Sequence, residues 1–172
     1  MAMPRKEFYL PLTKKEQLTK DVYSFYFKRP QDLDFLPGQY IRMILPIEKK
    51  DERGDSRFFT IASSPLEKDK IMITTRVIKS SFKKKLAELN IGERAKFFGP
   101  MGGFVLDEKE KGQRVFLAGG IGITPFHSML TYAHAKNLTI PITLIVSFSR
   151  VEDMVFYEEL LDIAKKDSYI KI

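Results

Sequence analysis

The chain has 172 residues, of which 44% are hydrophobic and 30% charged, a composition typical of one large or two small globular domains with a buried core. It contains no cysteine and two histidines, which excludes disulfides, thiolate zinc sites, iron–sulfur ligation and multi-histidine metal sites within this chain. The formal net charge of +7 suits nucleic acid, an acidic partner protein or a polyphosphate ligand, and equally a lysine-rich solvated surface.

The basic residues are scattered along the chain apart from Lys83–Lys85, a distribution that argues against nucleic acid as the partner. No apolar run approaches the roughly 18 residues of a membrane span, and the N-terminal segment lacks the apolar stretch of a secretory signal. We therefore expect a cytoplasmic protein without a transmembrane segment.

Short runs rich in aromatic and β-branched residues, separated by turn signals, predict β-structure in the first part of the chain. The runs are Phe8–Leu10, Val22–Phe27, Tyr40–Leu45, Phe58–Ile61, Ile71–Thr74 and Ala95–Phe98. Strands at this spacing predict an antiparallel barrel or sandwich. One helix is expected before the last strand, capped by Ser80 or Ser81, continuing through Leu86 and Leu89, and stopped by Gly92.

After the charged stretch Asp107–Gly112 the pattern changes to alternating strands and helices. The expected elements are a strand at Val115–Ala118, a helix from Pro125 to about Lys136, a strand at Ile142–Val146, a helix from Asp153 to Lys165 and a strand from Tyr169. This βαβαβ order predicts a parallel nucleotide-binding sheet whose first strand is buried on both faces. We expect two domains, 1–110 and 111–172, the second being about half of a doubly wound domain.

The loop Gly119–Pro125 follows the first parallel strand and opens a helix. Its glycines permit close approach of a ligand's phosphates to the backbone, and the free N–H groups of a helix N-terminus favour a pyrophosphate. Thr124 is a suitable N-cap, and Pro125 fits the first helical position. Gly120 and Gly122 meet only part of the dinucleotide fingerprint, so the alternative is a tight turn that needs glycine for its geometry alone.

The segment Arg57–Thr60 begins a predicted barrel strand after a polar loop. Arginine gives bidentate contacts to a phosphate, an aromatic ring can cover one face of a flavin, and a hydroxyl can hydrogen-bond the flavin's reactive nitrogen. Strand alternation lets only one of Phe58 and Phe59 cover the flavin while the other enters the core. The alternative is a surface arginine beside ordinary core aromatics.

Together and in this order, these segments resemble the ferredoxin–NADP reductase family. The family's flavin motif, Arg-x-Tyr-Ser/Thr, is matched by Arg57, Phe59 and Thr60, with phenylalanine where tyrosine is commoner. Residues 36–40 are similar to the family's Pro-Gly-Gln-Tyr strand entry, 99–104 to its Gly-Pro-x-Gly turn, and 118–125 to its Gly-Gly-x-Gly-x-Thr-Pro loop. The resemblance implies an antiparallel flavin-binding β-barrel followed by a truncated parallel α/β nucleotide-binding domain.

The resemblance also assigns residues to the cofactors. It implies that Arg57 holds the pyrophosphate of FAD, that Phe59 covers the isoalloxazine and that Thr60 lies near its N5, which makes Phe59 and Thr60 the catalytic candidates. The residues expected to bind the flavin are Arg57, Phe58, Phe59, Thr60, Thr75, Arg76, Val77, Ser80, Ser81, Phe82 and Lys83. Those expected on the nicotinamide-nucleotide side are Gly119, Gly120, Gly122, Thr124, Pro125, Ser147 and Arg150. Lys83 stands where the family has serine or threonine, which adds a charge to the pyrophosphate loop.

The implied activity is hydride transfer from NADH or NADPH to FAD, followed by electron transfer to an acceptor protein or small carrier. Such a reaction needs no general base and no metal in this chain. Because the family's C-terminal elements are absent, one alternative is a non-catalytic flavin-binding electron-transfer subunit without a complete nicotinamide site. A nucleotide- or nucleic-acid-binding module without flavin is the other. The expected partner is an electron acceptor or donor protein, an acidic one if the positive net charge guides its docking.

Overall fold

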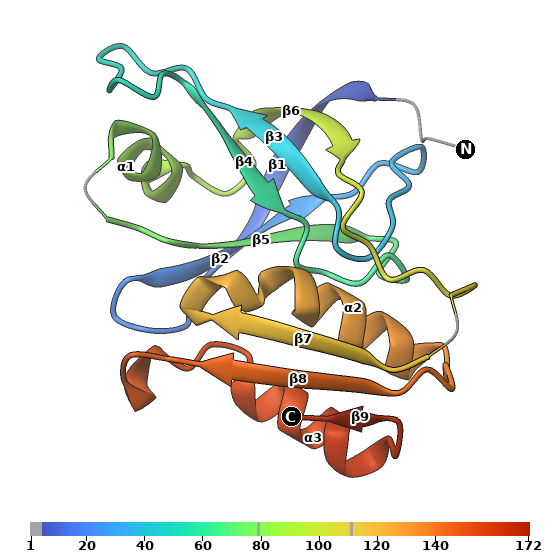
Figure 1. Cartoon of the computed structure of the whole chain (residues 1–172). Helices are drawn as coiled ribbons and strands as arrows, with labels where there is room; N and C mark the ends of the chain where they lie inside the picture. Colours follow the sequence, from blue (N-terminus) through green and yellow to red (C-terminus); the bar gives the residue numbers. More distant parts are fainter. Residues whose placement is uncertain (1–4, 79, 111) are drawn as a thin grey trace.

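A computed structural model of the chain describes residues 5–78, 80–110 and 112–172. The first part is an antiparallel six-stranded sheet that curls into a nearly closed barrel, in the order β4-β3-β6-β1-β2-β5 (Figure 1). Its strands are β1 (Lys6–Gln17), β2 (Val22–Lys28), β3 (Tyr40–Ile44), β4 (Ser56–Thr60), β5 (Lys70–Arg76) and β6 (Arg94–Met101). One helix, α1 (Ser81–Glu88), lies between β5 and β6. The predicted antiparallel barrel is confirmed.

The barrel encloses a core of aliphatic and aromatic side chains, because its strands alternate between inward and outward residues. On β3, Ile41 and Met43 are fully buried in this core. Phe27 and Phe97 meet edge-on there, with 4.9 Å between their ring centroids. Phe82 on α1 joins the same core with no exposed surface, so the helix is packed onto the barrel rather than standing apart from it.

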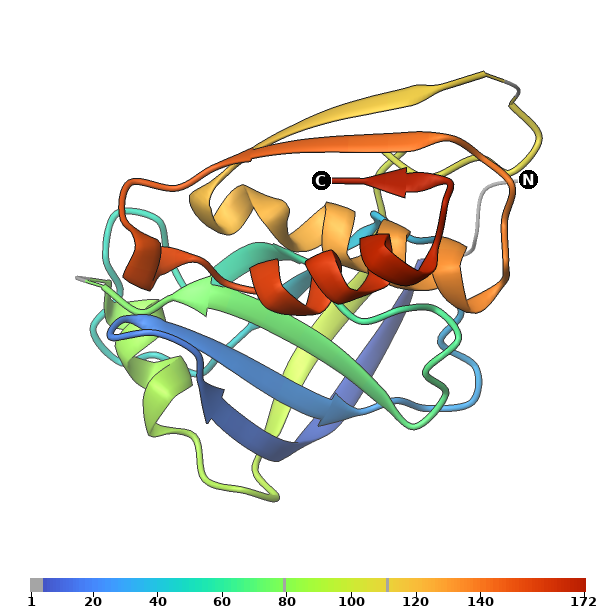
Figure 2. The ribbon, with the colours of Figure 1, turned by 90° about the horizontal axis from the view of Figure 1, so that it is seen from below.

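The second part is a three-stranded parallel sheet in the order β7-β8-β9. Its elements are β7 (Arg114–Gly119), the 3₁₀ turn η1 (Gly120–Ile123), α2 (Thr124–Ala135), β8 (Ile142–Ser147), the 3₁₀ turn η2 (Val151–Asp153), α3 (Tyr157–Lys166) and β9 (Ile170–Lys171). Both helices lie between the sheet and the barrel (Figure 2). This is the predicted βαβαβ order, and the proposed division at 110/111 falls between β6 and β7.

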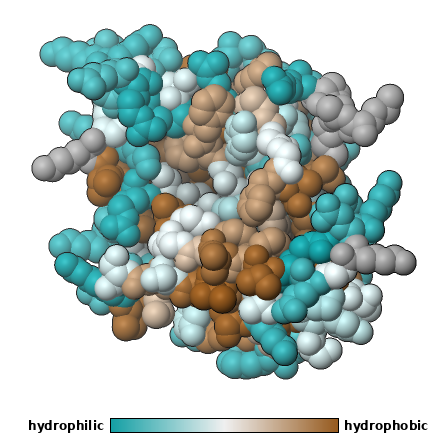
Figure 3. Space-filling model, viewed as in Figure 1, coloured by the Kyte–Doolittle hydropathy of each residue, from teal (hydrophilic) through white to brown (hydrophobic). Residues whose placement is uncertain are grey.

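The outer face of the parallel sheet is uncovered, so the prediction that its first strand is buried on both faces is wrong. Val115 and Leu117 on β7 are 59% and 72% exposed, and Ile145 on β8 is 55% exposed. These side chains contribute to the brown patch that Figure 3 shows over the parallel sheet. An apolar run predicts a strand, but it does not reveal how many of its faces are covered. Here right-handed crossovers step in one direction along the sheet and put both helices on the same side.

The helix starts differ from the predicted ones at both crossovers. α2 begins at Thr124 with Ile123 in the N-cap position, so Thr124 is the first helical residue and not the cap. α3 begins at Tyr157 rather than Asp153, because Phe156 has a left-handed φ of 61°. The Phe156 ring packs against His127, with 4.1 Å between the ring centroids. The hydrophobic pattern of the sequence runs on through Phe156 and so does not predict this late helix start. In the structure the late start coincides with a tertiary contact to α2.

Helix α2 joins the two parts of the fold. The Nδ1 atom of His127 lies 2.7 Å from the carbonyl oxygen of Ala62, and the Ser128 hydroxyl donates to the carbonyl of Ser63 at 2.7 Å. The other ring nitrogen of His127 lies 3.1 Å from a carboxylate oxygen of Glu159 on α3. Both residues on α2 are buried. The segment that follows β4 is therefore tied to the helix that follows the glycine loop.

Candidate functional site

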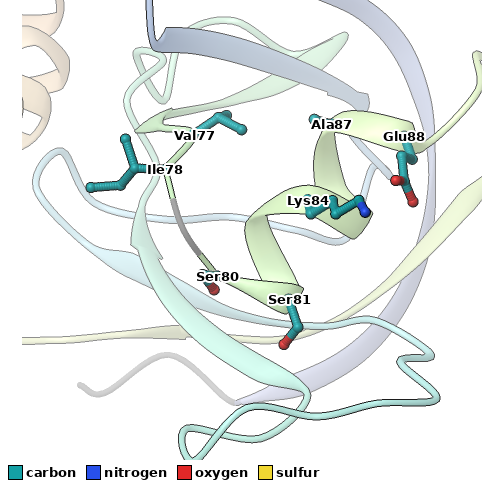
Figure 4. Close-up of a pocket in the computed structure, with 7 residues that line it drawn as sticks. All are labelled: Val77, Ile78, Ser80, Ser81, Lys84, Ala87 and Glu88. Carbon is teal, nitrogen blue, oxygen red and sulfur yellow. The ribbon is translucent and has the colours of Figure 1, made fainter.

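The start of α1 is built from Ser80 and Ser81. Ser80 has an extended backbone, and its hydroxyl accepts a hydrogen bond from the backbone N–H of Lys83 at 3.5 Å, so it caps the helix as predicted. A hollow of about 550 Å³ opens between this helix and the segment that follows β5 (Figure 4). Its lining includes Val77, Ile78, Ser80, Ser81, Lys84 and Glu88. The hollow thus combines an apolar wall with the hydroxyls and free N–H groups of a helix start, which suit an anion.

Arg57 on β4 reaches this helix start from inside the fold, with only 5% of the residue exposed. Its Nη2 donates to both carboxylate oxygens of Asp51, at 2.7 and 2.9 Å. Its Nη1 donates to the carbonyls of Arg53, Gly54 and Ser56, at 2.8, 3.0 and 2.8 Å. The guanidinium is therefore held in one orientation by the loop that precedes its own strand.

The remaining donor of Arg57, Nε, is buried without a hydrogen-bond partner. Among the described residues, the other buried side-chain nitrogen without a hydrogen-bond partner is Nε of Arg42 on the adjacent strand β3. Arg29, an equally buried arginine, shows the contrast, because its Nε donates to the carbonyl of Leu33 at 2.8 Å. An unsatisfied buried donor destabilises a fold, and a bound ligand's oxygen can satisfy it.

Lys83 adds a second cation on the other side of the helix start. Its ammonium donates to the hydroxyl of Thr75 and, at 2.8 Å, to the carbonyl of Arg76. Burial lowers the pKa of Lys83 below its usual value, and the positive charges of Arg53 and Arg57 lower it further. Arg57, whose Nη2 lies 3.4 Å from the Ser80 hydroxyl, and Lys83 therefore meet where α1 begins, with the positive charge of Arg53 near enough to act on the lysine.

Asp51 is the acidic member of this group, and the sequence patterns did not single it out. Besides its two bonds from Arg57, its carboxylate accepts a hydrogen bond from the Ser80 hydroxyl at 3.1 Å, while its backbone N–H donates to the Ser81 hydroxyl at 3.1 Å. The hydrogen bond from Arg57 lowers the pKa of Asp51 to about 2, with smaller contributions from the two serines. An aspartate in a polar loop is ordinary, so only its contact with Arg57 reveals a role.

This pair predicts how stability depends on acidic pH. An aspartate whose pKa is lowered on folding stabilises the folded state above its unfolded pKa of 3.8, and that contribution is lost as the pH falls towards about 2. We therefore expect the urea midpoint of the wild-type protein to fall more steeply between about pH 5 and pH 2 than that of Asp51→Asn. If the urea midpoints of the two proteins changed with pH in parallel, the pairing of Asp51 with Arg57 would not stabilise the folded state.

Strand β4 places its two phenylalanines on opposite faces. Phe59 is 8% exposed and packs in the barrel core, with its ring centroid 5.9 Å from that of Phe82. Phe58 points outward and is 62% exposed. Phe59 therefore shares a face of the strand with Arg57, while Thr60, partly buried, ends the strand. Of the two rings, the one beside the cations is Phe59, and it is packed rather than open.

The end of β5 brings Thr75, Arg76 and Val77 to the same region. Thr75 is buried, and its hydroxyl takes part in the bond from the lysine described above. The Arg76 guanidinium lies 3.2 Å from Asp21 in the barrel part and 3.9 Å from Asp153 in η2. Arg76 is thus paired with carboxylates from both parts of the molecule, and Val77 lines the hollow beside α1.

The glycine loop lies at the carboxyl end of the parallel strands, where ligands bind in sheets of this kind. Gly119 is aligned with Ser147 in the register of β7 and β8. A Cβ atom added at Gly119, Gly120 or Gly122 would meet nothing within 4 Å. Packing inside the protein therefore does not impose these glycines, although the φ of 48° at Gly120 does favour glycine there. The open space favours close approach of a ligand over a turn that serves its geometry alone.

The remaining predicted residues lie around this loop. Thr124 is buried at the first position of α2, and Pro125 follows it in the first turn. Arg150 precedes η2 with a side chain that is 72% exposed, and its guanidinium lies 3.9 Å from Glu152. The fold thus gathers most of the predicted flavin residues around α1, but it leaves Phe58 exposed on the other face of β4. The predicted nucleotide residues lie at the ends of β7 and β8 and, for Arg150, just before η2.

Comparison with protein families assigns both parts of the chain. Residues 9–106 match the oxidoreductase FAD-binding domain, and residues 116–172 match the oxidoreductase NAD-binding domain. The chain belongs to the FAD-binding oxidoreductases. This match confirms the predicted resemblance to the ferredoxin–NADP reductase family, with FAD as the cofactor of the part that residues 9–106 form.

Two curated relatives of this FAD-binding oxidoreductase are longer than the chain. An uncharacterized protein in the adh 3′ region of Clostridium beijerinckii is 30% identical over 167 residues, which cover 92% of this chain and 53% of that protein. The glycine betaine monooxygenase reductase subunit of Chromohalobacter salexigens is 30% identical over 148 residues, which cover 84% of this chain and 39% of that subunit. The chain therefore spans about half or less of the length of these relatives.

Solved structures give the same fold. Phthalate dioxygenase reductase superimposes with a TM-score of 0.78 at 25% identity, covering 96% of this chain and 51% of that one. The ferredoxin–NADP⁺ reductase of Plasmodium falciparum superimposes with a TM-score of 0.83 at 20% identity, covering 96% and 69% of the two chains. Within the described part of this oxidoreductase, no helix is both long and apolar enough to cross a bilayer.

Proposed function

We propose that this chain passes electrons between NADH or NADPH and an acceptor protein or small carrier through FAD. The observation that carries the proposal is the group of cations at the start of α1, with its unpartnered Arg57 Nε, in a chain whose second part bears an open glycine loop. An FAD pyrophosphate is the anion that fits such a site in an FAD-binding domain.

On this proposal Arg57, Lys83 and the N–H groups that follow Ser80 hold the pyrophosphate. FAD supplies the redox chemistry, accepting a hydride and releasing electrons one or two at a time. We keep the proposed places of Phe59 against the isoalloxazine and of Thr60 near its N5; both residues lie on the strand that carries Arg57, and the Phe59 ring packs in the barrel core. The hydrogen bonds from α2 to Ala62 and Ser63 set the position of this strand end relative to the glycine loop.

The proposed nucleotide side consists of the glycine loop, Ser147 and Arg150. Alignment of Gly119 with Ser147 supports a site across the ends of β7 and β8. The second candidate function is a flavin-bearing electron-transfer subunit that takes its electrons from another protein.

The proposed electron partner is an acidic acceptor or donor protein. Relatives such as the glycine betaine monooxygenase reductase subunit are named as reductase subunits. A net charge of +7 would steer an acidic acceptor or donor protein toward this chain. Such steering weakens with salt, so electron transfer to the partner should slow as ionic strength rises.

The test is a visible spectrum of the purified protein during titration with FAD, followed by anaerobic addition of NADH and then of NADPH. We expect flavin absorbance to appear with FAD and to bleach with one of the two nucleotides. A flavin-loaded protein that neither nucleotide reduces would leave only the electron-transfer subunit. A protein that gains no flavin absorbance when FAD is added would overturn both candidate functions.

A further inference from the structure

The Asp51 carboxylate occupies the part of Arg57 that a phosphate would use. Both of its oxygens lie on Nη2 of Arg57, at 2.7 and 2.9 Å, and the Ser80 hydroxyl donates to one of them at 3.1 Å. A guanidinium, a serine hydroxyl and a helix start are the groups that proteins offer to a phosphate. The carboxylate is therefore held as a bound anion would be, although it comes from the chain itself.

A second buried arginine has a different set of partners. Arg29 is as buried as Arg57, and its Nε and Nη1 are used by backbone carbonyls at 2.8 Å. Its carboxylate partner Asp34 is peripheral, with a single contact at 3.2 Å and a side chain that is 68% exposed. Arg57 instead gives its Nη2 to a carboxylate and leaves Nε without a partner. Its hydrogen bonding is thus incomplete in a way that a larger anion would complete.

We propose that Asp51 is an internal ligand of the Arg57 site, and that the pyrophosphate of the flavin must displace it to bind. This rests on the proposed place of FAD at the start of α1. Arg53, Arg57 and Lys83 give the site more positive charge than one carboxylate neutralises. A pyrophosphate carries more negative charge than the carboxylate and has more oxygens with which to accept hydrogen bonds from these cations.

The loop around Asp51 is suited to such a displacement. It joins β3 to β4, and Glu52 and Arg53 at its tip are exposed. Apart from its bonds to Arg57 and the helix start, the Asp51 carboxylate accepts a hydrogen bond from the backbone N–H of Arg53 at 3.0 Å, and the Asp51 carbonyl accepts one from the N–H of Gly54 at 2.9 Å, both within the same turn. Moving the carboxylate aside therefore breaks few contacts with the rest of the protein. If the Asp51 carboxylate occupies the site in about nine-tenths of the molecules, FAD binds about tenfold more weakly than it would to a site without this carboxylate.

The test compares wild-type apoprotein with Asp51→Asn by calorimetric titration, once with FAD and once with inorganic pyrophosphate. We expect the variant to bind both ligands about tenfold more tightly. Asp55→Asn is the matched control, because Asp55 lies in the same loop and pairs instead with Lys50 at 2.7 Å. Its affinities should equal those of the wild type. If Asp51→Asn is unfolded at the temperature of the titration, Asp51→Ser replaces it as the test variant.

The two ligands separate this inference from the proposed function. Equal or weaker binding of pyrophosphate by Asp51→Asn would overturn the internal ligand and make Asp51 a positioning partner of Arg57. Absence of pyrophosphate binding in every variant would overturn it as well. Tighter pyrophosphate binding without any binding of FAD would keep the internal ligand and reject the flavin site.

Discussion

Replacement of Arg57 by alanine should abolish most FAD binding and also destabilise the barrel. The side chain offers charge-assisted hydrogen bonds of about 1.5–3 kcal/mol each to a phosphate, so we expect FAD affinity to fall about 10- to 100-fold. Loss of its bonds to three loop carbonyls should lower the free energy of unfolding by about 2 kcal/mol. Flavin fluorescence titration and urea unfolding measure the two effects separately.

The control for this prediction is Arg29→Ala. Arg29 is equally buried and also binds several backbone carbonyls, but its partners Leu33, Pro65 and Glu67 lie in loops away from α1. We expect a similar loss of stability and an unchanged FAD affinity. Equal loss of FAD binding in both variants would mean that Arg57 acts only through the fold, and unchanged binding in Arg57→Ala would reject it as the pyrophosphate anchor.

The strands of the barrel were predictable because short runs of aromatic and β-branched residues are separated by turns that carry glycine and proline. Strand alternation put Phe58 and Phe59 on opposite faces of β4, which the structure confirms with exposures of 62% and 8%. The capped start of α1 was predictable as well, since Ser80 precedes an apolar pattern of helical period. These features depend on neighbours in the sequence.

Features that depend on distant neighbours were not predictable. Asp51 and Ser80 are separated by 29 residues, and only the folded loop brings this carboxylate to the helix start. The left-handed Phe156 that delays α3 packs on His127 from another helix. One face of β7 is uncovered because both crossover helices lie on the other side of the sheet. The apolar run Val115–Ala118 predicts a strand, but it carries no information about which side the helices cover.

The residue on which the geometry of the site most depends is Phe82, which carries no polar group. Its ring is fully buried, with the Arg57 guanidinium carbon 5.2 Å from its centroid and the Phe59 ring beside it. It therefore holds the start of α1 against the strand that bears the arginine. We expect Phe82→Ala to lower the free energy of unfolding by about 3–5 kcal/mol, because it leaves a cavity in the core. That is a large part of the stability of an ordinary domain.

FAD affinity should fall in Phe82→Ala even under conditions where the protein is folded, since the helix start and Arg57 lose their common support. Phe82→Leu refills most of the cavity and should recover most of both properties. Phe58→Ala is the matched control, because that ring is 62% exposed and its loss should change stability by no more than about 0.5 kcal/mol. Should Phe82→Ala unfold no more readily than Phe58→Ala, α1 would not be part of the barrel core. Its serines would then lack the rigid support that a pyrophosphate site needs.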